Sequence, residues 1–288
     1  MQVQTLIKII SKILKKFLPN SWYIYLQKIH RTKITSNKYR DYNLSEDLKY
    51  NENLFKLLNF DIEKIKLQLN SLNLKYHSPK LSWHYHLFVG LKNYFVNKKI
   101  NILEIGTSMG EFSNFISKVY DESDVTTIDL DESDNQFINT YGRNEKEKLD
   151  EFLKIRNKNL NRKNLNFIKL NSLNIKKYFN KKKFDLIWID GDHLNPQVTI
   201  DIINSLDLLN NDGIICTDDV IIDNKFKNTN YVSGEGFLTL KHLEEKGLIK
   251  NYYLIKRIRT KNAIYKKYVS VGTFKDNQKF IKHNYSKD

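Results

Sequence analysis

The stretch that decides the fold of this chain is Ile102-Leu103-Glu104-Ile105-Gly106-Thr107-Ser108-Met109-Gly110-Glu111-Phe112. An apolar run ends at a turn that contains glycine, and a helical pattern begins directly after the turn. Glycine lets the backbone pass close to a ligand, and the first turn of a helix presents free N–H groups. We therefore expect a nucleotide-type ligand at the carboxyl end of this strand, as in other open α/β sheets.

The spacing of this loop separates it from the common phosphate-binding motifs. It reads Glu104-x-Gly106-x-x-x-Gly110, whereas a dinucleotide fingerprint reads G-x-G-x-x-G and a P-loop carries a lysine. An acid inside the strand end suits a ligand with a cationic or amino group better than a pyrophosphate. The next apolar run ends at Asp129, whose carboxylate is placed to accept hydrogen bonds from both hydroxyls of a ribose.

The rest of the sequence repeats this pattern of a strand followed by a helix. Short apolar runs occupy residues 100–105, 125–130, 165–170, 184–189 and 213–217. Their alternation with helical segments predicts an α/β fold with a doubly wound, mostly parallel sheet. Two further runs, 252–258 and 268–274, follow closely on one another and predict an antiparallel pair at one edge of that sheet.

Three regions are predicted along the chain: a helical extension over residues 1–75, the α/β domain over 76–275 and a polar tail over 276–288. Residues 3–18 carry apolar side chains at helical spacing, with lysines mostly outside the stripe, and predict a basic amphipathic helix. Such a helix can dock on the body of the protein or on a second copy in a homo-oligomer. It can also lie on an anionic bilayer as a peripheral contact at the inner face of a membrane. Both interpretations stay open.

The composition disfavours several classes of protein. A single cysteine, Cys216, rules out a disulfide framework and fits a reducing, cytoplasmic compartment. No stretch approaches the ~20 apolar residues of a membrane span. The formal net charge of +15 suggests a polyanion partner, but only 7 of the 48 basic residues are arginines. Nucleic acid is therefore an unfavoured partner.

Acidic residues follow two of the predicted strands. Asp190 ends the run 184–189, and Asp218 and Asp219 end the run 213–217. Since parallel strands end at the same edge of a sheet, these carboxylates are expected to converge. Clustered carboxylates repel one another unless a cation neutralises them, and oxygen ligands favour Mg²⁺, with Mn²⁺ or Ca²⁺ as alternatives. Aspartates at strand ends also cap helices and shape turns without a metal, so that alternative stays open.

With these motifs the chain resembles the class I S-adenosylmethionine-dependent methyltransferases, which have a Rossmann-like fold, over roughly residues 80–275. The resemblance implies S-adenosylmethionine as cofactor. It implies these cofactor-binding residues: Glu104, Gly106, Thr107, Gly110, Asp129, Asn171 and Ser172. Glu104, Gly106 and Gly110 would hold the methionine part and Asp129 the ribose. Asn171 and Ser172 would lie beside the adenine, where many members of the class carry an acid instead.

The acidic residues resemble those of the metal-dependent O-methyltransferases of the catechol, caffeoyl-CoA and sugar kinds. That resemblance implies Asp190, Asp218 and Asp219 as metal ligands. The catechol kind places its basic group three residues after the first of these aspartates, which is His193 here. In the implied chemistry the metal orients two neighbouring hydroxyls and lowers the pKa of one of them. Asp190 and His193 are then the catalytic residues, with His193 as the base.

The predicted function is O-methyl transfer to a hydroxyl of a small molecule, with divalent-metal assistance, and analogy favours a sugar or glycan precursor as acceptor. One alternative is a nucleic-acid (RNA) methyltransferase, against which stand the sparse arginines and the absence of any Pro-Pro tetrapeptide motif. Another is a non-catalytic, membrane-associated scaffold with the same fold. The intact Glu104 loop and Asp129 argue against it.

Overall fold

The structure is a computed structural model, and it describes residues 44–78, 81–95, 98–140, 143–223, 228, 232–257, 266–277 and 280. The predicted amphipathic helix at residues 3–18 lies outside the described residues. Among the helices in the described ranges, none combines the length and apolar character that crossing a bilayer requires.

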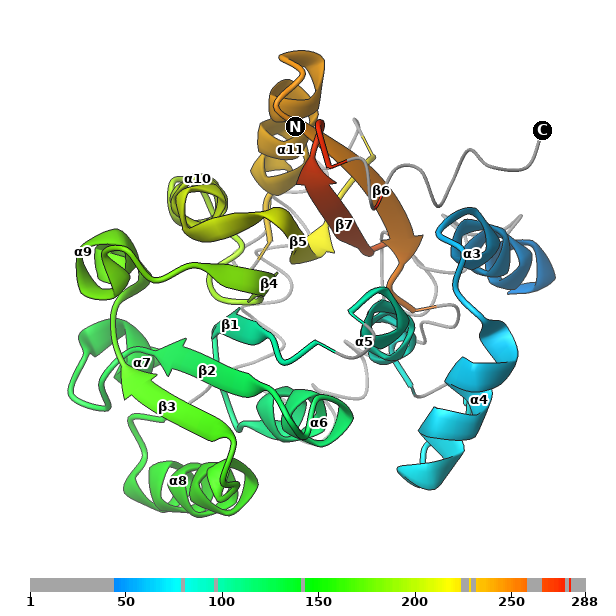
Figure 1. The fold of residues 1–288 in the computed structure, drawn as a ribbon. Helices are drawn as coiled ribbons and strands as arrows, with labels where there is room; N and C mark the ends of the chain where they lie inside the picture. Colours follow the sequence, from blue (N-terminus) through cyan, green and yellow to red (C-terminus); the bar gives the residue numbers. More distant parts are fainter. Residues whose placement is uncertain are drawn as a thin grey trace, which may run out of the picture.

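A seven-stranded sheet forms the centre of the molecule (Figure 1). Its strands are β1 (Asn101–Ile105), β2 (Asp124–Asp129), β3 (Leu165–Lys169), β4 (Phe184–Ile189), β5 (Leu209–Val220), β6 (Ile249–Ile255) and β7 (Tyr268–Phe274). They lie in the order β3-β2-β1-β4-β5-β7-β6, and the pairs from β3 to β5 are parallel. β7 runs antiparallel between β5 and β6. The predicted sheet, with its antiparallel pair at one edge, is confirmed.

The start of β5 differs from the prediction. The strand begins at Leu209 rather than at Gly213, so the polar residues 210–212, which have the composition of a turn, continue it. Leu209 pairs with Phe184 of β4 and is buried. Its burial and pairing outweigh the turn composition of the residues that follow.

Helices cover both faces of the sheet, as a doubly wound fold requires (Figure 1). Successive strand residues point into two different cores. Ile102 lies in the core beneath α5 (Trp83–Tyr94) and α6 (Glu111–Val119). Leu103 lies in the core beneath α10 (Gln197–Leu208) and α11 (Glu235–Glu245).

Three short elements and one long helix fill the connections on either side of β3. They are α7 (Asn135–Asn139), α8 (Lys146–Leu160), the 3₁₀ helix η1 (Ser172–Asn174) and α9 (Ile175–Phe179). α7 and η1 follow the carboxyl ends of β2 and β3, so both lie at the edge of the sheet where a ligand is expected.

The N-terminal helices α3 (Leu44–Leu57) and α4 (Ile62–Ser71) share one core with α5. Phe55 of α3 is fully buried, and its ring centroid lies 5.4 Å from that of Trp83. Phe280, in the predicted polar tail, is also buried and packs 5.2 Å from the ring of Tyr94. Parts of the predicted extension and tail thus pack on the α/β domain, whereas the predicted boundaries stay predictions.

Candidate active site

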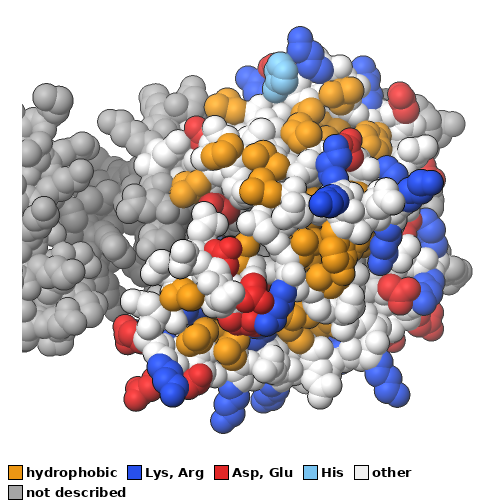
Figure 2. All heavy atoms as spheres, turned by 90° about the vertical axis from the view of Figure 1, so that its left-hand side faces the viewer, with side chains coloured by type: hydrophobic (Ala, Val, Ile, Leu, Met, Phe, Trp, Pro, Cys, Tyr) orange, Lys and Arg blue, Asp and Glu red, His pale blue; other side chains and the backbone are white. Residues whose placement is uncertain are grey.

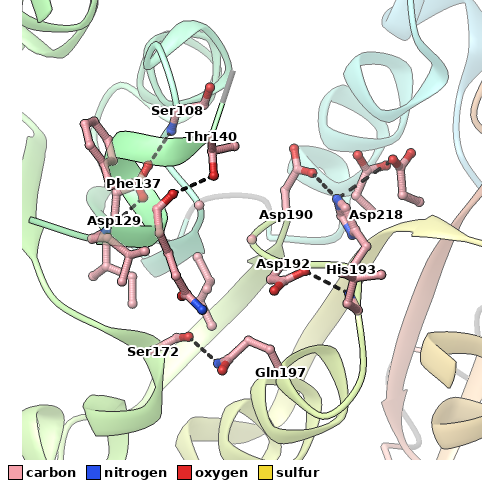
Figure 3. A pocket seen from close by; sticks show the side chains of 18 of the residues that line it. Ser108, Asp129, Phe137, Thr140, Ser172, Asp190, Asp192, His193, Gln197 and Asp218 are labelled. Carbon is pink, nitrogen blue, oxygen red and sulfur yellow. Dashed lines mark hydrogen bonds and ion pairs between the residues drawn. The ribbon is translucent and has the colours of Figure 1, made fainter. Parts of the chain in front are cut away.

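A cavity of about 830 Å³ opens at the carboxyl ends of the parallel strands (Figure 3). Its volume is typical of sites for small molecules, which measure roughly 300–1,000 Å³. In Figure 3, Asp129 and Thr140 lie on one side, and Asp190, His193 and Asp218 lie across from them. We call these two sides the Asp129 half and the His193 half.

Gly106 connects the two halves. Its backbone has a φ of 98°, and a Cβ at this position would lie 2.2 Å from the carbonyl oxygen of Asp190. The Gly106 N–H donates to the Ile128 carbonyl (2.9 Å), and the Asp190 N–H donates to the Ile105 carbonyl (2.8 Å). Only glycine fits this conformation and this space, so the turn after β1 is fixed against the end of β4.

Asp129 ends β2 with its side chain in the cavity, as predicted. Its two carboxylate oxygens accept hydrogen bonds from the backbone N–H groups of Ser108 and Leu130, both at 2.8 Å. Burial raises the pKa of Asp129, although these two N–H donors and Arg143 oppose the shift. The carboxylate is held rigidly and keeps acceptor capacity for ligand hydroxyls, because each oxygen has two lone pairs.

Asn171 and Ser172 also line the cavity, at the end of β3. The side chain of Asn171 accepts a hydrogen bond from the Leu173 N–H (3.0 Å) and so caps η1. Gln197, at the start of α10, donates to the Ser172 hydroxyl and to the Asp201 carboxylate, both at 2.8 Å (Figure 3 shows the first). The positions of Asn171 and Ser172 agree with the prediction, whereas a contact with adenine stays a prediction.

Glu104, Thr107 and Gly110 are not part of the described lining of the cavity. The carboxyl group of Glu104 is buried beneath α6 and accepts hydrogen bonds from Ser113 and from Thr127 (2.6 Å). Burial raises the pKa of Glu104 to about 8, although these two donors oppose the shift. The predicted roles of Glu104 and Gly110 in holding the methionine part, and of Thr107 in binding the cofactor, therefore stay predictions.

The His193 half contains the predicted acidic residues. His193 Nε2 lies 3.4 Å from Asp190 Oδ1 and 3.8 Å from Asp219 Oδ2. The main chain of His193 is fixed by Ser233, whose N–H (3.1 Å) and hydroxyl (2.8 Å) both donate to its carbonyl. Asp218 is almost fully buried. The neighbouring carboxyl ends of the parallel strands β4 and β5 thus bring these side chains together.

Two lysines that the sequence did not single out complete this half. Lys256 Nζ donates to Asp219 Oδ1 (2.7 Å) and to Asp218 Oδ2. Lys267 Nζ donates to Asp219 Oδ2. Lys256 follows β6 and Lys267 precedes β7, so both come from the antiparallel pair beside β5. The cation that three clustered carboxylates require is therefore present in the chain itself.

The pKa values follow from this arrangement. Burial, and then the charge of Asp218, raise the pKa of Asp190 to about 7. Burial alone would raise the pKa values of Asp218 and Asp219, but Lys256 holds both below their usual range. Burial would lower the pKa of His193, but its hydrogen bond with Asp190 and the nearby aspartates raise it. The aspartates around His193 thus favour its protonated form.

The turn after β1 and an acid at the end of β2 meet in one cavity, on a sheet whose last antiparallel strand is inserted between β5 and β6. This combination agrees with the class I S-adenosylmethionine-dependent methyltransferases that the sequence resembles. Residues 103–220, from β1 to the end of β5, match the family described as methyltransferase domain. That segment belongs to this family.

Several solved structures resemble the chain at low identity. A candidate caffeoyl-CoA O-methyltransferase from Staphylococcus aureus has 20% identity and a TM-score of 0.49, covering 78% of this chain and 98% of that one. An O-methyltransferase from Bacillus cereus, in complex with SAH, has 18% identity and a TM-score of 0.44, covering 76% of this chain and 90% of that one. No curated protein matches the sequence. At these identities and TM-scores, the likenesses carry no information on the acceptor.

Proposed function

We propose that this enzyme transfers the methyl group of S-adenosylmethionine to a hydroxyl oxygen of a small acceptor. The observation that carries the proposal is that one cavity joins Asp129, a candidate ribose ligand, to His193, a candidate base beside Asp190. The glycine turn supports the proposal, because a Cβ at Gly106 would clash with the Asp190 carbonyl and force the turn after β1 away from the end of β4. When bound, S-adenosylmethionine supplies an electrophilic methyl group.

His193 and Asp190 have distinct tasks in the proposed reaction. A free hydroxyl is a poor nucleophile, so His193 Nε2 accepts its proton as the oxygen attacks. Asp190 Oδ1, 3.4 Å from Nε2, stabilises the imidazolium that forms when Nε2 takes the proton. Asp192 has a structural task, because its side chain accepts a hydrogen bond from the Leu194 N–H (2.9 Å) and shapes the turn.

The lining of the His193 half supports a hydroxyl-rich acceptor. Among the described residues, this half consists mainly of carboxylates, lysines and an imidazole, with Leu194 and Val232 as apolar contributors and no Phe, Tyr or Trp side chain. A catechol would need an apolar wall for its ring, whereas a sugar or glycan precursor presents hydroxyls that such charged groups can bind. We therefore favour a sugar or glycan precursor as acceptor.

The donor set fits a divalent metal poorly. Asp190, His193 and Asp218 offer ligand atoms within 4.8 Å of one another, which on its own would suit Mg²⁺. However, Lys256 is bound to Asp218 and Asp219, and Lys267 is bound to Asp219. A divalent ion would have to lie beside two ammonium groups and compete with them for the same oxygens. We derive no step that uses a metal.

The alternative of a nucleic-acid substrate gains no support from the surface in view. On the face shown in Figure 2, lysines and arginines are scattered among acidic and apolar side chains rather than gathered into one basic stripe. Binding along a nucleic-acid backbone needs such a stripe. A small-molecule acceptor therefore remains the favoured proposal.

Two measurements test the proposed function. Isothermal titration calorimetry of the full chain with S-adenosylmethionine should show one binding site. Transfer of a tritiated methyl group should then be followed to a panel of monosaccharides, nucleotide sugars, catechol and total RNA, with label expected in the sugars. Absence of cofactor binding would reject the proposed function, and label in RNA alone would replace the acceptor class with nucleic acid.

A further inference from the structure

The side chain of Lys256 lies inside the candidate active site. Its Nζ contacts Asp218 and Asp219, and the side chain is only 12% exposed, against 1% for Asp218 and 9% for Asp219. Surface lysines seldom contact carboxylates this deeply buried, because their ammonium groups stay in water. The contact is therefore part of the site rather than a surface ion pair.

The backbone fixes Lys256 in this position. Its carbonyl accepts hydrogen bonds from the Trp83 N–H (2.7 Å) and from the Ser82 hydroxyl (3.0 Å), at the start of α5. Its own N–H donates to the Lys267 carbonyl (2.9 Å), across the antiparallel pair. Three hydrogen bonds from two different elements thus hold the residue on both sides.

Among the described residues, the ion pair of Lys256 and Asp218 leaves one N–H donor of Lys256 and one carboxylate oxygen of Asp218 without a hydrogen-bond partner. An ammonium group has three N–H donors, of which Asp218 and Asp219 take two, and Lys256 lines the cavity. Asp218 Oδ1 is buried and has no hydrogen-bond partner among the described residues. A buried carboxylate oxygen without a partner is costly, so a ligand group is expected there. Two neighbouring hydroxyls of one acceptor can satisfy both positions, because one accepts from the Lys256 N–H and the other donates to Asp218 Oδ1.

We propose that Lys256 takes the place of a divalent metal in this enzyme, so that the reacting hydroxyl of the acceptor binds at the Lys256 ammonium group and a neighbouring hydroxyl binds at Asp218, without a metal ion. The proposal rests on the proposed function. The hydroxyl proton passes to His193 Nε2, and the oxygen electron pair forms the bond to the methyl carbon, whose bond to sulfur breaks with its electrons kept by sulfur. The Lys256 N–H stabilises the negative charge that develops on the oxygen.

The proposal predicts how the protein binds Mn²⁺, a paramagnetic probe for sites of this kind. We expect titration of the full chain with Mn²⁺, followed by electron paramagnetic resonance, to give the same number of bound ions for the wild type and for Asp218→Asn. The variant Lys256→Met should gain one bound Mn²⁺, because Asp218 loses its ammonium partner and Asp219 keeps only Lys267. The double variant K256M/D218N should lose it again.

A matched control is available at the opposite end of the strands, where β1 and β4 begin. Lys98 Nζ donates to Asp185 Oδ1 (2.8 Å), and Asp185 is buried as Asp218 is, so Lys98→Met also removes a lysine from a buried aspartate. This variant should gain no Mn²⁺. Circular dichroism establishes that each variant is folded. If Lys256→Met fails to fold, the comparison of wild type with Asp218→Asn decides alone.

Two results would overturn the proposal: one Mn²⁺ bound to the wild type and lost in Asp218→Asn, or a folded Lys256→Met that binds none. Methyl transfer gives an independent readout, because the wild-type rate should change less than twofold after treatment with EDTA. Failure of the proposed function shows separately, as absence of S-adenosylmethionine binding in calorimetry, and leaves the Mn²⁺ result interpretable.

Discussion

Asn51 of α3 and Ile255 of β6 are joined by two hydrogen bonds of 2.9 Å. The side-chain amide of Asn51 donates to the Ile255 carbonyl, and its oxygen accepts from the Ile255 N–H, so the side chain acts as one residue of a neighbouring strand. β6 is the last strand of the sheet, and this contact satisfies part of its free edge. Lys256 is the next residue, so the N-terminal helices support the active site directly.

The substitution Asn51→Ala should therefore destabilise the protein. It leaves the N–H and carbonyl of Ile255 buried without partners, at about 1–3 kcal/mol for each group. We expect the free energy of unfolding to fall by roughly 2–4 kcal/mol in urea denaturation. Lys49→Ala, at an exposed position of the same helix, is the control and should match the wild type. An Asn51→Ala variant as stable as this control would contradict the proposed role.

The substitution Asp129→Ala should weaken cofactor binding without unfolding the protein. It removes the carboxylate that is expected to accept hydrogen bonds from the ribose, and bonds to a charged acceptor contribute about 1.5–3 kcal/mol. The Kd for S-adenosylmethionine, measured by calorimetry, should rise about tenfold to hundredfold. Asp131→Ala removes an exposed aspartate nearby, paired with Lys169, and should leave the Kd unchanged. Equal Kd values for the two variants would remove Asp129 from the cofactor site.

The substitution Gly106→Ala should abolish cofactor binding and lower the melting temperature. Its Cβ would lie 2.2 Å from the Asp190 carbonyl oxygen, and the φ of 98° is unfavourable for any side chain. Both effects force the turn after β1 away from β4. Gly234→Ala is the control, because a Cβ there would meet no atom within 4 Å. We expect thermal unfolding to separate the two variants clearly, and similar curves would show that the turn tolerates a shift.

The sequence allowed the sheet to be predicted, together with the strand end at which Asp129 lies. The five parallel strands and Asp129 each leave a local signal, because apolar runs end at polar residues and strand ends of a parallel sheet share an edge. The contacts of Lys256 leave no such signal. This residue is one of 41 lysines, and it meets Asp219 because the antiparallel pair of β6 and β7 lies beside β5 in the folded sheet.

Two further features of the site depend on the folded backbone. Asp219 has a φ of 51°, a left-handed conformation that costs free energy and is uncommon outside glycine. The sequence Asp218-Asp219 does not predict this conformation. Glu104 has the spacing of a cofactor ligand, yet its carboxyl group lies beneath α6 rather than in the described lining of the cavity. Spacing places a residue on a strand, whereas packing decides the partners of its side chain.

The substitution His193→Gln should lower kcat and leave cofactor binding intact. Gln keeps the size and polarity of the side chain but cannot accept the proton, and general base catalysis contributes about 10²–10⁴-fold. We expect kcat for the sugar acceptor to fall by about that factor, with an unchanged Kd for S-adenosylmethionine. His242→Gln, at an exposed position of α11, should match the wild type in both respects. A His193→Gln enzyme with full kcat would assign the base elsewhere.

The substitution Glu104→Gln should change how stability depends on pH. Burial raises the pKa of Glu104 from the usual 4.5 to about 8, so the folded protein holds a proton that the unfolded chain has already released. The stability from protonated Glu104 is therefore complete below about pH 4.5 and is lost as the pH rises through about 8. Gln is neutral throughout, so the free energy of unfolding of Glu104→Gln, relative to wild type, should increase between pH 5 and pH 8. The control is Glu111→Gln, an exposed residue of α6, for which the difference should stay flat. If this difference in the free energy of unfolding does not change with pH for Glu104→Gln either, Glu104 is ionised in the folded protein. Its carboxylate would then suit the cationic ligand that the spacing of the loop predicts.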